Sequence, residues 1–175
     1  MPYLSDLSTW MNAQPADKPG ESDQHWQTAT NRYPTQAVVL DIAADLAYVH
    51  LLSRCACAFL EGIPKLEEPE ITLYNLELAI QEVSVNIVKH AYAQTSGRIH
   101  MTLLLDEQPL RLTITLQDTG HTFDPTQVPS PKLGELQEHG FGLFLVRQLM
   151  DEVIYEHNSS GNIWKLVKNI PVIEA

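Results

Sequence analysis

Apolar positions along this chain follow two periods, and the change from one period to the other marks the expected elements. Residues 37–44 (AVVLDIAA) are a short apolar run, which predicts a strand. Residues 45–62 place apolar side chains three or four positions apart, which predicts a helix capped by Asp45. The apolar stripe of that helix comprises Leu46, Val49, Leu52, Ala56 and Phe59 or Leu60. A strand followed by an amphipathic helix therefore opens the patterned part of the chain.

A second amphipathic helix is predicted over residues 72–91, after a loop over residues 63–72. The apolar stripe of this helix is Leu76, Ile80, Val83 and Ile87. Two segments with a strand pattern follow, at residues 97–106 and 110–118, and they are joined at DEQP. This arrangement predicts a β-hairpin.

A long connection, a helix and a second hairpin complete the pattern. Residues 119–139 contain prolines and show no apolar period, whereas residues 140–153 open on glycines and have a helical pattern. Residues 153–169 predict a closing hairpin with its turn at Asn158 to Gly161. Strands and helices do not alternate regularly, which disfavours a doubly wound parallel sheet. We predict an α+β fold, a two-layer α/β sandwich with a mixed, mainly antiparallel sheet and helices on one face.

The first 34 residues differ from the rest of the chain. They are rich in Pro, Asp, Gln and Thr and have no apolar period, so we predict a loosely ordered or docked extension over residues 1–34. Trp10 and Trp26 within it are expected to pack onto the domain, with a partner protein as the alternative. The sequence has 175 residues, of which 44% are hydrophobic. This suits one folded domain over residues 35–175.

The charge balance narrows the classes of partner. The chain has 22 acidic residues against 11 Lys and Arg, a formal net charge of −11. Sequence-independent nucleic-acid binding depends on neutralising phosphates, and anionic lipid also attracts basic surfaces. We therefore expect no direct nucleic acid and no membrane among the partners, whereas a basic protein is compatible.

Neither the cysteines nor the N-terminus indicates secretion. Cys55 and Cys57 point to different faces of the predicted helix, so they are poorly placed to bridge, and two thiols fall short of the four ligands of a zinc site. The first residues lack a positively charged start and an apolar run, and no apolar stretch approaches the roughly 20 residues of a membrane span. We expect a cytoplasmic protein.

Three polar residues on the second predicted helix are candidates for chemistry. Glu82, Asn86 and Lys89 are separated by four and three positions, which keeps them on one stripe beside the apolar face. Taken alone, such a stripe is more typical of a solvated flank than of a site.

Two glycine-containing segments are further candidates. Asp118 ends a predicted strand, and Gly120 permits a tight turn and the close approach of a ligand. Gly140 and Gly142 stand at the start of a predicted helix, where free N–H groups and the helix dipole favour an anion. Each signal alone is weak, because such turns and loops are common.

The order and spacing of these segments together resemble the GHKL (Bergerat-fold) ATPase superfamily. AIQEVSVNIVKHAY resembles its N box, DTGHTFDP its first glycine box and HGFGLFLVRQLMDEVIY its second. The segments KHAY, FDP and GLFLVRQLMDEV are most similar to the anti-sigma factor serine-protein kinases of bacterial partner-switching systems. The resemblance covers about residues 36–170 and excludes the extension.

The resemblance implies ATP and Mg²⁺ as cofactors. It assigns Asn86 to Mg²⁺, for which an amide oxygen is a suitable ligand, and Glu82 to the role of general base or of orienting the nucleophile. It places Lys89 near phosphate, while the neighbouring His90 is expected to be a helix-end histidine.

The glycine boxes supply the rest of the implied nucleotide site. Asp118 would accept a hydrogen bond from the adenine amino group, and Gly120 would let the base lie against the turn. Phe123 belongs to the same box. Gly140, Gly142 and the N–H of Leu143 would contact phosphate. Residues 124–139 would form an ATP lid whose closure depends on the γ-phosphate.

Two positions depart from the family pattern. His139 stands where the subgroup often has a glycine, so it is expected to contact phosphate or stiffen the lid. Asn162 follows Gly161 where relatives often have threonine, and its amide can replace the hydrogen bond of that threonine toward adenine.

The resemblance implies a kinase that phosphorylates Ser or Thr on a small STAS-type anti-anti-sigma protein and sequesters a regulatory target such as a sigma factor. Retention of Glu82 favours turnover. The alternative is a non-catalytic regulator that binds its partner according to the nucleotide. A histidine-kinase catalytic domain is disfavoured, because no dimerising helical hairpin with a phospho-acceptor histidine is visible. Relatives often dimerise, so a homodimer is compatible.

Overall fold

The computed structural model describes residues 36–63, 66–93, 95–107, 109–122 and 141–173. In chain order, the helices and strands are β1 (Gln36–Ala43), α3 (Val49–Glu61), α4 (Pro69–Asn86), η1 (Ile87–Tyr92), β2 (Arg98–Glu107), β3 (Leu110–Asp118), α5 (Phe141–Leu149), β4 (Glu152–Asn158) and β5 (Gly161–Asn169). The predicted extension over residues 1–34 and the predicted lid lie outside the described residues.

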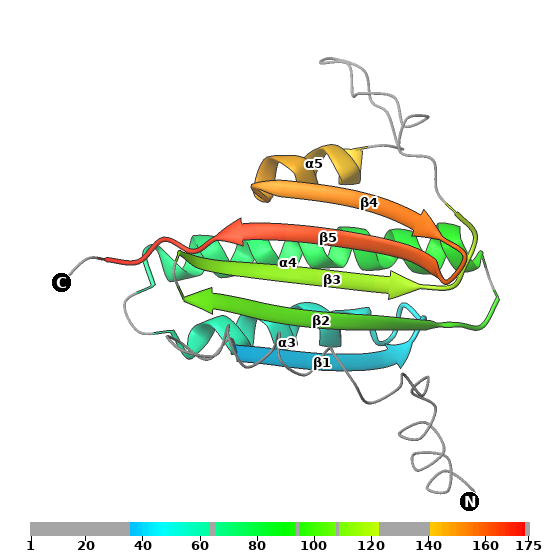
Figure 1. Cartoon of the computed structure of the whole chain (residues 1–175), viewed down its shortest axis with the longest axis horizontal. Coiled ribbons are helices and arrows are strands. Elements are labelled where there is room, and N and C mark those ends of the chain that lie inside the picture. Colours follow the sequence, from blue (N-terminus) through cyan, green and yellow to red (C-terminus); the bar gives the residue numbers. More distant parts are fainter. Residues whose placement is uncertain (1–35, 64–65, 94, 108, 123–140, 174–175) are drawn as a thin grey trace, which may run out of the picture. The chain divides into compact units, whose positions relative to one another are not determined.

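The strands of the described residues form a single five-stranded sheet in the order β1-β2-β3-β5-β4. Every neighbouring pair is antiparallel, so the sheet of the described chain has no parallel pair. Figure 1 shows α3 and α4 behind this sheet, with α5 beside β4. The predicted α+β fold, a two-layer sandwich with helices on one face, is confirmed.

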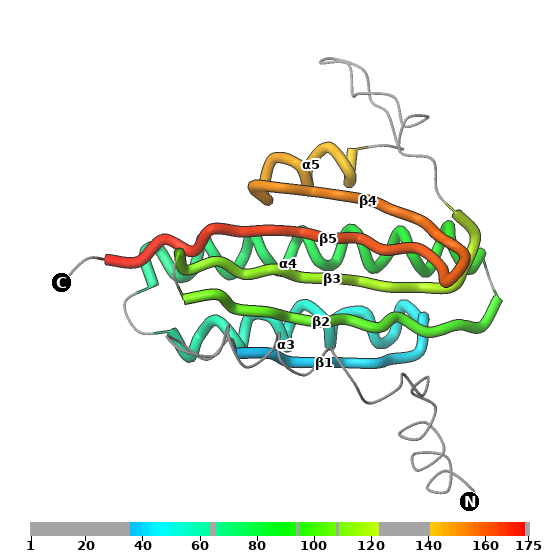
Figure 2. The backbone as a smooth tube through the Cα atoms, viewed as in Figure 1, coloured from blue at the N-terminus to red at the C-terminus, as the bar shows by residue number. Residues whose placement is uncertain are grey.

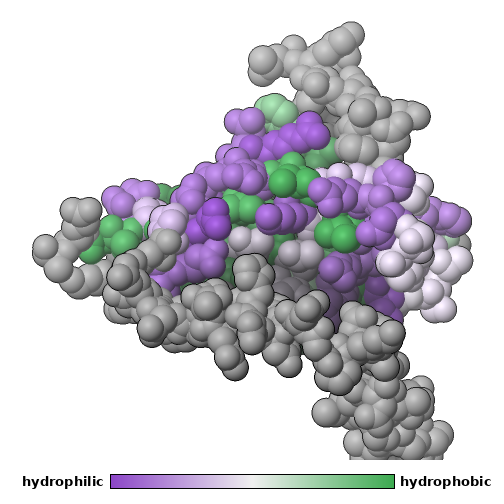
Figure 3. Space-filling view, in the orientation of Figure 1, coloured by the Kyte–Doolittle hydropathy of each residue, from purple (hydrophilic) through white to green (hydrophobic). Residues whose placement is uncertain are grey.

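The apolar side chains of the predicted helix stripe and of the predicted strands lie in the core between these layers. The stripe predicted on the second helix is buried, as are the alternating side chains of the two central strands. The buried strand residues are Ile99, Met101, Leu103 and Leu105 on β2, and Leu112, Ile114 and Leu116 on β3. Antiparallel sheets can keep their other face in water, and Figure 3 shows hydrophilic and hydrophobic groups interleaved there. Val39, 57% exposed, stands in register with Thr102 on that face.

Three of the predicted helix ends differ in the structure. The first helix begins at Val49, because Asp45 closes a turn before it, accepting a hydrogen bond on Oδ1 from the Ala47 N–H at 2.8 Å. Asp45 is therefore not the helix cap, and Leu46 is 49% exposed rather than part of the stripe. The second helix begins earlier than predicted, at Pro69, and proline suits the first helical turn.

The last helix ends at Leu149, before the predicted boundary at Val153. Asp151 explains the difference, because it is bonded to the sheet rather than to a helical turn. Its N–H donates to the Val167 carbonyl at 2.9 Å, and its Oδ2 accepts from the Asn169 N–H at 2.6 Å. Pairing with β5 therefore begins immediately after α5.

Several chain segments converge at one end of the sheet. Figure 2 shows that the carboxyl ends of β3 and of the α4–η1 helix lie at the same end as the turn between β4 and β5. The predicted N box and first glycine box are thus brought to the same end. Within the described helices, none is long and apolar enough to cross a membrane.

Candidate functional site

The helix that carries the predicted N box changes its winding at the site. α4 ends at Asn86 and continues as a π-helix, η1, over Ile87–Tyr92. Single π-turns within helices occur frequently at functional sites. Glu82 and Asn86 are partly buried on α4, whereas Lys89 and His90 are exposed on η1.

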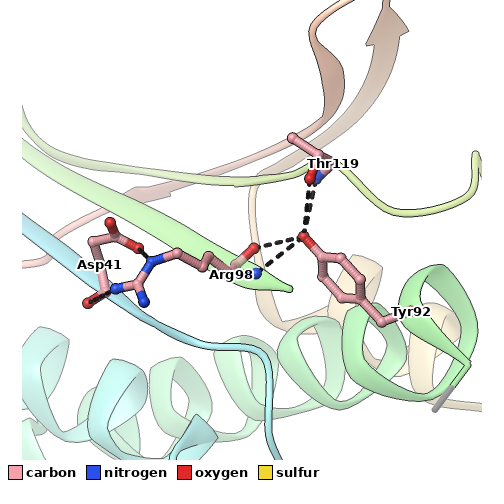
Figure 4. Close-up of polar contacts among 4 residues, drawn as sticks. All are labelled: Asp41, Tyr92, Arg98 and Thr119. Carbon is pink, nitrogen blue, oxygen red and sulfur yellow. Dashed lines mark hydrogen bonds and ion pairs between the residues drawn. The ribbon is translucent and has the colours of Figure 1, made fainter. Parts of the chain in front are cut away.

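Tyr92, the last residue of η1, joins the helix to the start of β2 and to the turn after β3 (Figure 4). Its buried hydroxyl donates to the Arg98 carbonyl at 2.8 Å and accepts from the Thr119 N–H at 3.0 Å and the Arg98 N–H at 3.2 Å. Arg98 opens β2 and in turn forms an ion pair with Asp41 at 2.8 Å. The phenol therefore holds the turn after Asp118 against the end of the helix.

Replacing Tyr92 by phenylalanine should reduce stability without changing the packing of the ring. The backbone groups of Arg98 and Thr119 would lose a buried partner, and such a loss costs about 1–3 kcal/mol. Urea unfolding followed by circular dichroism measures the change in the free energy of unfolding. Tyr48→Phe is the control, since Tyr48 is exposed and should change stability by less than about 0.5 kcal/mol. Equal stability of the two variants would contradict this role for Tyr92.

The turn after β3 lies directly on η1. A Cβ on Gly120 would stand 2.5 Å from the Ala91 carbonyl oxygen, so only glycine fits there without moving the backbone. The His121 N–H donates to the same carbonyl at 2.7 Å. The sequence predicted that a ligand could approach closely at Gly120. In the structure, the Ala91 carbonyl at the end of the helix approaches Gly120 closely.

Asp118 is a buried carboxylate at the base of this turn. It is 4% exposed, and its Oδ1 accepts from the Gly120 N–H and from Asn162 Nδ2, each at 2.8 Å. Burial raises the pKa of Asp118 above its usual value, while the bonds from Asn162 and Gly120 oppose that shift. The two bonds favour the ionised form, in which the carboxylate can only accept hydrogen bonds.

The start of α5 packs against the acid and the amide of the predicted N box. A Cβ on Gly142 would collide with Glu82 Oε2 and would stand 3.9 Å from Asn86 Nδ2. The structure therefore brings Glu82, Asn86 and Gly142 together from segments that are far apart in the sequence. The absent side chain at Gly142 leaves room for the Glu82 carboxylate.

A small pocket, with a cavity volume of about 30 Å³, lies between these segments. Four predicted site residues line it: Asn86, Asp118, Leu143 and Asn162. Its wall is largely apolar, and Asp118 and Asn162 are the buried polar groups at its base. This combination suits a flat, partly apolar ligand with a hydrogen-bond donor.

The pocket also includes residues for which the sequence predicted no role there. Tyr155, Trp164 and His121 line it, and so does His90, whereas Lys89 does not. Tyr155 and Trp164 are paired across β4 and β5, with ring centroids 4.7 Å apart. The alternation of side chains along each strand places these two residues on the inward face, but neither belongs to a motif that predicts a pocket. Phe123, His139 and Gly140 lie outside the described residues.

The cysteines are free, partly buried and not among the residues of this pocket. Burial raises the pKa of the Cys57 thiol to about 11, and the nearby Glu77 and Glu61 carboxylates add to the shift. A thiol that stays protonated at neutral pH is a poor nucleophile and a poor metal ligand.

Comparison with known proteins relates this fold and pocket to one family. The model of the histidine kinase-like ATPase domain matches residues 42–168. The serine-protein kinases RsbW of Bacillus thuringiensis (strain Al Hakam) and Bacillus cereus (strain AH187) are each 34% identical over 98 residues, covering 51% of this chain. The aligned region spans only 59% of the length of those relatives.

A solved structure shows the same fold. The crystal structure of RsbU and RsbW domains from Mycobacterium tuberculosis matches with a TM-score of 0.57 and 18% identity, covering 82% of this chain and 36% of that one. These findings confirm the fold and the family resemblance. The roles of individual residues remain predictions.

Proposed function

Since this chain belongs to the histidine kinase-like ATPase domain family, we propose that it is an ATP-dependent serine/threonine-protein kinase of the anti-sigma factor type. Its substrate would be a Ser or Thr hydroxyl on a small STAS-type anti-anti-sigma protein. The kinase would also sequester a regulatory target, such as a sigma factor. Similarity to RsbW kinases supports this proposal.

The observation that carries the proposal is that Asp118 and Asn86 line one pocket, and that Glu82 and Asn86 both lie beside Gly142 at the start of α5. Asp118 and Asn162 lie buried together, whereas Glu82 and Asn86 meet the start of α5 at Gly142. An adenine amino group would reach Asp118, and the phosphates would extend toward the N-terminus of α5, where free N–H groups favour anions. The pocket residues therefore fit a nucleotide with its base buried.

The oxygen ligand that Asn86 would offer near the phosphates also fits Mg²⁺. The Asn86 amide oxygen is a hard ligand, and Mg²⁺ usually takes few protein ligands because it keeps waters and phosphate oxygens. A bound Mg²⁺ would supply charge neutralisation at the phosphates. Among the residues of this chain, Asn86 would hold that ion.

Glu82 would handle the proton of the attacking hydroxyl. The Ser or Thr oxygen forms a bond to the γ-phosphorus, the bond from that phosphorus to the bridging oxygen breaks, and ADP leaves. The hydroxyl proton passes to the Glu82 carboxylate. The remaining contribution of the protein is to position the groups and stabilise charge.

Two measurements test the function. Calorimetry with ATP and ADP, with and without Mg²⁺, tests nucleotide binding, and transfer of labelled γ-phosphate to candidate STAS proteins tests the kinase. Binding together with transfer to a Ser or Thr of a STAS protein is the expected result. ATP binding without transfer to any candidate would favour the non-catalytic regulator. No binding of ATP would overturn the proposal as a whole.

Asn86→Ala should abolish the Mg²⁺-dependent part of ATP binding and leave the fold intact. The side chain lies at the edge of the core and lines the pocket, so its removal takes away a metal ligand but little packing. Calorimetry at several Mg²⁺ concentrations measures the effect. Asn75→Ala on the same helix is the matched control, because Asn75 is also partly buried but does not line the pocket. An unchanged Mg²⁺ requirement in Asn86→Ala would rule out the metal assignment.

A further inference from the structure

Asn162 is enclosed by partners that determine which way its amide points. The side-chain nitrogen faces three acceptors: Asp118 Oδ1 at 2.8 Å, and the carbonyls of Gly120 and His121, each at 3.2 Å. The side-chain oxygen faces the Tyr155 hydroxyl at 2.9 Å, which donates to it. Asn162 is 2% exposed, so these contacts are made away from water.

The orientation of this amide controls what Asp118 can do. In the observed orientation Nδ2 donates to Asp118 Oδ1, and the Gly120 N–H donates to the same oxygen. If the amide were reversed, its oxygen would face the carboxylate oxygen and two carbonyls, and its NH₂ would face a hydroxyl. A buried amide in that orientation loses its bonds to Asp118, Gly120 and His121.

The observed orientation leaves one carboxylate oxygen for a ligand. Both bonds from Gly120 and Asn162 go to Oδ1, and within the described part of the chain no group donates to Asp118 Oδ2. Asp118 also lines the pocket. The carboxylate is therefore oriented by its protein partners, with its second oxygen remaining as an acceptor.

We propose that Tyr155 is a positioning residue for base recognition. Its hydroxyl fixes the Asn162 amide, and the amide in turn holds Asp118 so that Oδ2 accepts a hydrogen bond from the exocyclic amino group of a purine. The inference rests on the proposed function, because it deepens the recognition of adenine at that same site. It extends the site to β4, a strand that carries none of the predicted site residues.

Tyr155 also packs against Trp164, so its test must separate the hydroxyl from the ring. Tyr155→Phe removes the hydroxyl and keeps the ring. The probes are ATP and purine riboside 5′-triphosphate, which differ at the exocyclic amino group, and binding of each is measured by calorimetry. The ratio of the two dissociation constants reports the amino-group contact alone, because a loss of packing would weaken both ligands together.

Wild-type protein should bind ATP roughly 5- to 150-fold more tightly than the analogue, the range for an unpaired buried polar group. In Tyr155→Phe we expect this ratio to fall by about 5-fold or more. Tyr74→Phe is the control, since Tyr74 is 63% exposed on α4, and its ratio should equal that of the wild type.

The same substitution in a protein that already carries Asn162→Thr tests whether Tyr155 acts through Asn162. In Asn162→Thr there is no amide to orient, so adding Tyr155→Phe should leave the ratio of that variant unchanged. A wild type that discriminates, together with a Tyr155→Phe variant whose ratio is unchanged, would overturn the positioning role and leave the proposed function standing. If adding Tyr155→Phe to Asn162→Thr still lowers the ratio of the two dissociation constants, Tyr155 does not act through Asn162. Equal wild-type affinity for both probes would overturn the amino-group contact and the positioning role together.

Discussion

Glu82→Gln should lower phosphotransfer by about 10²- to 10⁴-fold, the range for loss of a general base, while ATP binding stays close to that of the wild type. Glutamine has the shape of glutamate but no charge to draw the proton from the attacking hydroxyl. The Glu82 carboxylate is partly buried and abuts Gly142 at the start of α5. It therefore lies where the phosphates are expected, and not on a freely solvated flank.

Single-turnover transfer of labelled phosphate to the STAS partner, at saturating ATP, measures this effect. Glu70→Gln is the matched control, because Glu70 is an exposed glutamate in the first turn of the same helix. It removes one charge without approaching the pocket, and its transfer rate should be that of the wild type. Transfer by Glu82→Gln at the wild-type rate would show that Glu82 is not the base.

Asp118→Asn should weaken ATP binding by one to two decades. The two N–H donors at Oδ1, from Gly120 and Asn162, require an acceptor at that position. The new amide would therefore keep its oxygen there and present its NH₂ to the pocket. An NH₂ group facing the adenine amino group replaces a hydrogen bond by two opposed donors. An unpaired buried polar group costs about 1–3 kcal/mol, which agrees with that loss.

Calorimetry with ATP measures the affinity of Asp118→Asn, and urea unfolding checks that the fold is retained. Asp106→Asn serves as the control, since Asp106 lies on β2 in a partly exposed ion pair with Arg111, and pairs near the surface contribute little. Its ATP affinity should be unchanged. If Asp118→Asn binds ATP as tightly as the wild type, Asp118 is not the adenine acceptor.

The fold class could be predicted from the sequence because its evidence is local. The stripe of Leu76, Ile80, Val83 and Ile87 and the alternation along β2 and β3 each repeat within one element, and all of these side chains are buried. The order of the elements disfavoured a doubly wound sheet. The sequence predicted a mixed, mainly antiparallel sheet but no strand order, because strand order depends on contacts between distant segments.

The residues of the candidate site could be predicted only where they belong to a motif. Asn86, Asp118, Leu143 and Asn162 were named from spacing and resemblance, and the structure places all four on one pocket. Tyr155 and Trp164 were not named, because each occupies an ordinary inward position of a strand. Their relation to the pocket exists only after β4 has paired with β5.

The sequence by itself determined the periodicities, the family resemblance and the positions of the chemical groups along the chain, since each depends on residues close together in sequence. The tertiary structure decided where helices end and what the polar groups contact. Asp151 bonds to Asn169 on β5 rather than to a helical turn, and the helix of the N box widens into the π-helix η1. Asp118 meets Asn162, 44 residues later, because β3 and β5 are neighbours in the sheet. A hydrogen bond between such distant residues is set by strand pairing, which no local pattern encodes.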